Sequence, residues 1–146
     1  MNGNMKMKLF VLTSIAVCLQ LLGYSQAALP ASWNFDVATP AGWTESLGTN
    51  GNTRYANGQA GQACKLDATG EFVLLEFAEE PGMLSYYMKG QGTGGAFQGT
   101  FTIQESADGN NFTTLHEFVN GDLATDAFTL YSDQPMATTR YIRWYY

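Results

Sequence analysis

Short runs in which apolar and polar residues alternate are the feature that most restricts the fold of this chain. In Phe72-Val-Leu-Leu-Glu-Phe77 and in Met83-Leu-Ser-Tyr-Tyr-Met-Lys89 the pattern is close to a period of two, which places successive side chains on opposite faces of a strand. No segment shows convincing helical spacing. The composition agrees, because 16 glycines, 14% aromatic residues and only 14% charged residues are typical of strands joined by tight turns.

The same pattern continues to the end of the sequence and predicts about six or seven short strands. Two hairpins are expected, one across Pro81-Gly82 and one across the turn Ser106-Ala-Asp-Gly-Asn-Asn111, whereas residues 47–62 read as a long polar loop. Each strand can bury one face only by packing against a second sheet. The sequence therefore predicts an all-β, antiparallel β-sandwich whose strands cover residues 72–77, 83–89, 99–105, 112–118, 127–131 and 139–146.

The first 27 residues are typical of a signal peptide. Lys6 and Lys8 precede the apolar run Leu9–Leu22, and the small residues Ser25 and Ala27 fit the positions before a cleavage site. The run is shorter than the roughly 20 residues of a membrane-spanning helix. We expect a signal peptide over residues 1–27 and a domain over residues 28–146, secreted or held at the cell surface, with no membrane span after cleavage.

The charge of the chain excludes one large class of partner. A net charge of −6 with only seven Lys and Arg residues does not suit a nucleic-acid binder, which needs clustered bases to displace counterions. Cleavage of the signal peptide would leave Cys64 as the only cysteine, so no intramolecular disulfide is expected.

Four patterns suggest chemistry, and each has a plainer interpretation. Gly90–Gly95 matches G-x-G-x-x-G, but a strand is expected after it instead of the helix that a dinucleotide needs. His116 is the only histidine and is expected to face solvent, since no triad or zinc partner stands at a recognisable spacing. Asp108-Gly-Asn110 offers oxygens that calcium could use, but the loop motif fails at Phe112. Glu79 and Glu80 suggest the paired carboxylates of a glycosidase, but they flank a turn and are expected to be solvated. The sequence predicts no enzyme, no cofactor and no metal site.

Outward-facing residues on two strands give a more useful signal. If Leu84, Tyr86 and Met88 face the core, the intervening residues face outward, and the same alternation applies to the last strand. Aromatic rings can stack on sugar faces and polar groups can bind hydroxyls, so a glycan platform is expected on one face, made of Tyr87, Lys89, Gln104, Tyr141, Arg143 and Tyr145. Loops at the end of a sandwich often bind ligands, which makes Trp43, Arg54 and Tyr55 a second candidate surface.

Residues 64–146 resemble the jelly-roll modules of secreted and surface proteins of Bacteroidetes-type bacteria. The resemblance lies in Cys64–Phe77, Pro81–Gly92, Gly99–Phe112 and Thr139–Tyr146. Such modules are similar to galactose-binding-like and discoidin-like domains and usually accompany secreted enzymes. The resemblance implies a jelly-roll topology and a further strand after the last one here, so we expect this chain to be a fragment.

These observations together favour a non-catalytic accessory module that binds a glycan or a cell-surface polymer. The alternative is a structural or adhesive spacer of a larger exported protein that binds no small ligand. Either would have neighbouring domains as partners. The two differ at the outward residues of the platform, because single alanine substitutions there should abolish binding only in a saccharide-binding module.

Overall fold

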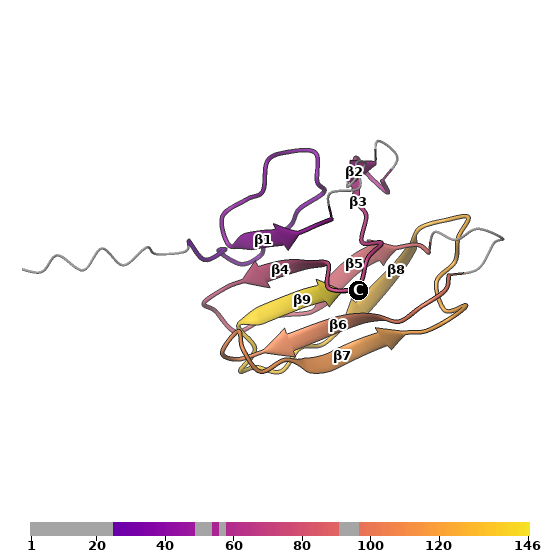
Figure 1. The fold of residues 1–146 in the computed structure, drawn as a ribbon. Helices are drawn as coiled ribbons and strands as arrows, with labels where there is room; N and C mark the ends of the chain where they lie inside the picture. Colours follow the sequence, from indigo (N-terminus) through magenta and orange to yellow (C-terminus); the bar gives the residue numbers. More distant parts are fainter. Residues whose placement is uncertain (1–24, 49–53, 56–57, 91–96) are drawn as a thin grey trace, which may run out of the picture.

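The computed structural model describes residues 25–48, 54–55, 58–90 and 97–146. Within these residues the chain forms nine strands and no helix (Figure 1). The strands are β1 Trp43–Ser46, β2 Arg54–Tyr55, β3 Ala63–Cys64, β4 Phe72–Glu76, β5 Leu84–Met88, β6 Phe101–Ser106, β7 Thr113–Phe118, β8 Thr129–Asp133 and β9 Tyr141–Tyr145. The predicted all-β class is confirmed.

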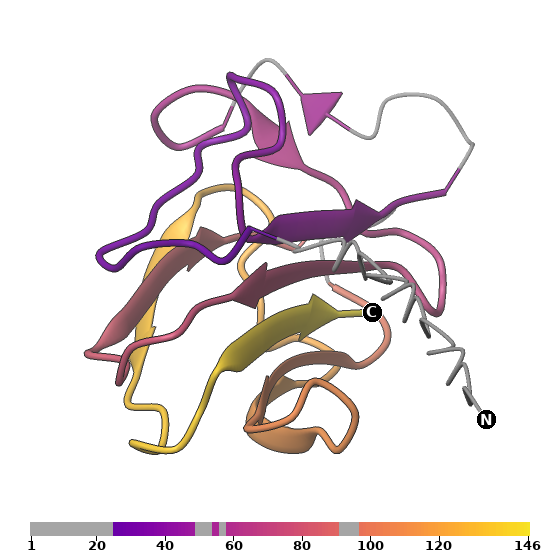
Figure 2. The same cartoon turned by 90° about the vertical axis from the view of Figure 1, so that its left-hand side faces the viewer.

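Seven of these strands build two sheets that share a core. The larger sheet has the order β1-β4-β9-β6-β7, and β5 pairs with β8 in the smaller one; every pair of neighbouring strands is antiparallel. Seen from two sides, the smaller sheet lies against one face of the larger (Figures 1 and 2). The short pair β2-β3 stands apart. This arrangement is consistent with the expected antiparallel β-sandwich.

One of the two predicted hairpins forms and the other does not. β6 and β7 pair across the turn at residues 106–111, where Gly109 has a φ of 73° that suits glycine. The hairpin expected between residues 72–77 and 83–89 was wrong, because β4 pairs with β1 and β9 while β5 crosses to the other sheet. Alternation of apolar residues in β4 and β5 fits either partner, so the pairing depends on contacts distant in sequence.

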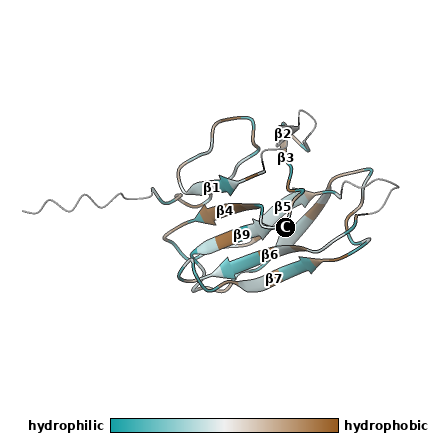
Figure 3. Cartoon of the chain, in the orientation of Figure 1, coloured by the Kyte–Doolittle hydropathy of each residue, from teal (hydrophilic) through white to brown (hydrophobic). Residues whose placement is uncertain are grey.

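The core lies between the sheets and is rich in aromatic rings. The most deeply buried large side chains include Phe77, Ile103, Phe118 and Ile142. Ring contacts run across the core from Trp43 to Trp144 at 5.8 Å, from Trp144 to Tyr86 at 6.2 Å and from Tyr86 to Tyr131 at 5.9 Å, measured between centroids. Figure 3 shows β4 as the most uniformly apolar strand and more hydrophilic residues on β6 and β7. The rings of the two sheets thus hold the layers together.

The predicted boundary after Ala27 falls in a segment that contacts the domain. Ala27 is buried, its amide donates to the Glu76 carbonyl at 2.9 Å, and it forms a parallel bridge with Phe77. Gly42, with a φ of 79°, passes so close that a Cβ there would collide with Ala27. Residues 1–24 lie outside the described part, so the signal peptide stays a prediction. Over the described residues no helix is long and apolar enough to cross a membrane.

Candidate functional site

Strand β9 has one face in the core and the other on the outside of the larger sheet. Ile142 is buried and Trp144 packs against the core, as the period of two predicts. Tyr141, Arg143 and Tyr145 point the other way and are half-buried. No ring contact joins these three to the smaller sheet among the described residues. The outer face of the larger sheet is therefore where the candidate residues of β9 meet their neighbours on β6.

Arg143 and Gln104 form the best-defined contact on this face. The two residues pair across β9 and β6, and Nε and Nη2 of Arg143 both donate to Oε1 of Gln104, at 2.8 and 2.5 Å. The guanidinium carbon lies 3.8 Å from the ring centroid of Phe112 and 4.8 Å from that of Tyr145. Two rings and an amide thus hold this cation in place.

The charge of Arg143 has no carboxylate partner within the described ranges. Its Nη1 also makes no hydrogen bond to a described residue. Partial burial lowers the pKa of Arg143, and the Tyr145 phenol opposes that shift. Arginine nevertheless keeps its proton at neutral pH, so this face carries a positive charge with donor capacity to spare.

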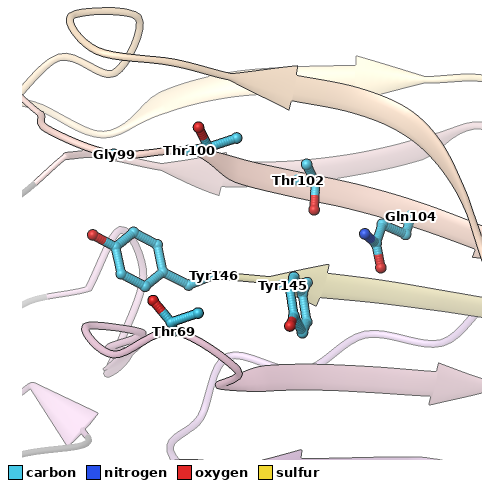
Figure 4. A pocket seen from close by; sticks show the side chains of 7 residues that line it. All are labelled: Thr69, Gly99, Thr100, Thr102, Gln104, Tyr145 and Tyr146. Atoms are coloured by element: carbon cyan, nitrogen blue, oxygen red, sulfur yellow. The ribbon is translucent and has the colours of Figure 1, made fainter.

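An open hollow of about 370 Å³ lies beside this pair at the end of β9. Gln104 and Tyr145 belong to both the hollow and the Arg143 cluster, and residues from the loops before β4 and β6 complete the wall (Figure 4). The lining is Thr69, Gly99, Thr100, Thr102, Gln104, Tyr145 and Tyr146. A tyrosine ring, an amide and three threonine hydroxyls are the types of group that orient a polar ligand in a largely apolar cavity.

Thr102 has an unmet hydrogen-bonding group in the wall of this hollow. Its side chain is 9% exposed, and its Oγ1 is buried without a hydrogen-bond partner among the described residues. Figure 4 shows the hydroxyl pointing from β6 toward Tyr145 at the end of β9 and the following Tyr146. Buried hydroxyls are normally satisfied, so Thr102 is an exception in the wall of the hollow.

Tyr141 is on the same face but at the opposite end of β9. Its hydroxyl donates to Oε1 of Glu76 at 3.2 Å, and its ring lies against Gly109. Burial, and then the neighbouring Glu76 carboxylate, raises the pKa of Tyr141. Four residues along a strand span about 13 Å, which separates Tyr141 from Tyr145 and leaves it beyond the hollow.

The expectation that Tyr87 and Lys89 share one face with these residues was wrong. Both lie on or beside β5, in the smaller sheet. Tyr86 points inward to Trp144, so its neighbour Tyr87 points away from the larger sheet, where it is 49% exposed. Tyr87 pairs across the strands with Leu130, and Lys89 lies over the Phe128 ring at 5.2 Å. The predicted platform is therefore split between opposite outer faces.

The second predicted surface also changes. Trp43 is the first residue of β1, not of a loop, and packs on Trp144 and on Trp33. It also borders a smaller hollow of about 160 Å³ beside Glu76, but its ring serves mainly the core. Arg54 and Tyr55 form β2, and their side chains lie outside the described part of the structure.

Sequence reasoning missed a polar cluster between the sheets. His116, expected to face solvent, instead places Nδ1 2.9 Å from Oδ1 of Asp133 and stacks on Phe118 at 4.2 Å. The Tyr86 hydroxyl donates to Oδ2 of the same carboxylate at 2.6 Å. Because His116 and Phe118 are two residues apart, their alternation contained a signal that the histidine faces inward.

The Asp108 turn and the glycine-rich motif give no second candidate site among the described residues. Asp108 accepts hydrogen bonds from the Asn110 and Asn111 amides and from the Ser106 hydroxyl; those of Asn111 and Asn110 lower its pKa most. These bonds are turn chemistry. Gln91–Ala96, most of the glycine-rich motif, lies outside the described residues. No group of three or more potential metal ligands occurs among the residues described.

Comparisons with protein-family models, with curated proteins and with solved structures each found no match.

Proposed function

We propose that this chain is a secreted, non-catalytic β-sandwich module of jelly-roll topology that binds carbohydrate or a cell-surface polymer on the outer face of its larger sheet. The path of the chain supports the topology, since β4, β5 and β6 alternate between the sheets and β9 returns between β4 and β6. The module would be an accessory part of a longer exported protein.

The observation that carries this proposal is the hollow beside the Arg143–Gln104 pair. It joins a tyrosine ring to hydrogen-bonding groups on an open sheet face, and a sugar ring needs both, an aromatic surface for its C–H face and polar partners for its oxygens. The amide nitrogen of Gln104 makes no hydrogen bond to a described residue. This nitrogen leaves two N–H donors for a ligand.

The test is binding of the purified chain to a panel of immobilised neutral and acidic polysaccharides. We expect saturable binding that weakens about tenfold or more in Tyr145→Ala, because a buried aromatic contact contributes more than about 1 kcal/mol. Tyr87→Ala is the matched control, since it removes a half-exposed tyrosine from the opposite face. A folded chain that binds no polysaccharide would refute the proposal and favour the structural spacer.

A further inference from the structure

We infer that the hollow on the outer face selects acidic polysaccharides and binds the carboxylate of a uronic acid unit. This inference rests on the proposed saccharide-binding function and narrows its substrate class. It follows from the kinds of polar group in the hollow, from the orientation of the Gln104 amide and from the unpaired charge of Arg143.

The side chains that line the hollow are mostly hydrogen-bond donors or hydroxyls. Its polar side chains are one amide and the hydroxyls of three threonines and two tyrosines, and none of its seven lining side chains carries a carboxylate. Sites for neutral sugars need strong acceptors for the many sugar hydroxyls, and a carboxylate is the strongest acceptor among side chains. A wall that lacks one suits a ligand that itself brings the acceptor.

The Gln104 amide is held in one orientation by Arg143. Two N–H groups of Arg143 donate to its oxygen, and this fixes which end of the amide faces the guanidinium. The nitrogen, with its two N–H groups, is directed toward Thr102 and the hollow (Figure 4). Arg143 is thus a positioning residue that makes Gln104 a donor to the ligand.

Arg143 places a positive charge beside the hollow. Arg143 lies between the rings of Phe112 and Tyr145 with no carboxylate partner in the described ranges, and its Nη1 is available. A ligand carboxylate near Gln104 would gain charge-assisted hydrogen bonds, which a neutral sugar cannot.

The experiment compares one polymer in two charge states. Polygalacturonate and alginate are the acidic probes, and fully methyl-esterified polygalacturonate is the neutral counterpart of the first. We expect the chain to bind the acidic polymers about tenfold or more tightly, the range for charged hydrogen bonds. Added salt should weaken only the binding of the acidic polymers, because it screens exposed charges.

Two variants that each remove one positive charge test whether the preference for acidic polymer depends on Arg143. Arg143→Gln and Lys89→Gln each remove one positive charge, the first beside the hollow and the second on the opposite face, and only the first should lose the preference for acidic polymer. Gln104→Glu supplies a carboxylate that still accepts from Arg143, so the fold should be retained while binding of acidic polymer is lost. Circular dichroism spectra and thermal melting of each variant confirm folding.

The outcomes separate this inference from the proposed function. Equal affinity for the esterified and unesterified polymers, or binding to neutral polysaccharides alone, overturns the acidic preference and leaves saccharide binding standing. An equal loss in Lys89→Gln overturns it too, because general charge attraction would then explain the preference. A folded chain that binds no saccharide of either kind overturns both.

Discussion

The two faces of β9 use the same five-residue strand for different purposes. On the inner face Ile142 and Trp144 contact rings and aliphatic groups from both sheets. On the outer face, among the described residues, Arg143 contacts neighbours of its own sheet and the adjoining Phe112. The inner side chains are held on all sides, whereas the outer ones have unused hydrogen-bonding groups. Stability and binding should therefore separate residue by residue along one strand.

The largest expected loss of stability follows a substitution on the inner face of β9. Ile142→Ala should lower the free energy of unfolding by about 2–5 kcal/mol, because it leaves a cavity in a close-packed core; the side chain is only 2% exposed. Urea unfolding followed by tryptophan fluorescence measures this change. A loss below about 1 kcal/mol would mean that the two faces of β9 differ less than their burial implies.

The second-largest loss of stability is expected in the polar cluster of Tyr86, His116 and Asp133 between the sheets. Tyr86→Phe removes the hydrogen bond to Asp133 and should cost about 1–3 kcal/mol at neutral pH. Burial, and then the contact with Asp133, raises the pKa of Tyr86, so its contribution is complete below pH 10 and declines as the pH rises above that value. Unfolding curves from pH 7 to about pH 11 should show the two proteins converging; a constant difference would contradict this assignment.

The turn that leads to Phe112 should have a smaller, pH-dependent effect. Asp108→Ala should reduce stability at neutral pH because it deletes the acceptor of several backbone bonds. Since these bonds lower the pKa of Asp108, its contribution is present above the usual value of about 4 and disappears as the pH falls below it. Thermal melting between neutral and acidic pH measures this. Asp126→Ala, which removes one exposed acid elsewhere, is the control for the loss of one negative charge.

The smallest expected effect on stability is on the outer face. Arg143→Gln should lower the free energy of unfolding by less than about 2 kcal/mol, because it removes a cation–π contact at a partly exposed site and the hydrogen bonds from the guanidinium to Gln104. Urea unfolding beside Ile142→Ala measures the contrast directly. If Arg143→Gln destabilises the chain as much as Ile142→Ala does, the guanidinium is required for folding. The loss of polysaccharide binding in Arg143→Gln would then result from unfolding and not from a lost contact with the ligand.

Local alternation was enough to predict the strands near β4 to β9 and the direction of most side chains within them. It separated Tyr145 and Arg143 from Ile142 and Trp144 correctly, because a period of two is a property of the strand alone. Local alternation did not identify β1, whose four residues follow Pro40-Ala-Gly42, a segment typical of a turn. It also gave the wrong prediction that His116 faces solvent.

The sequence by itself determined the all-β class and which side chains of one strand share a face. Tertiary structure alone decided which faces meet. The pairing of β5 with β8, over 40 residues away, put Tyr87 opposite to Arg143, and the pairing of β9 with β6 brought Arg143 to Gln104. Such contacts depend on the burial of both sheets at once, so a pattern within one strand cannot encode them.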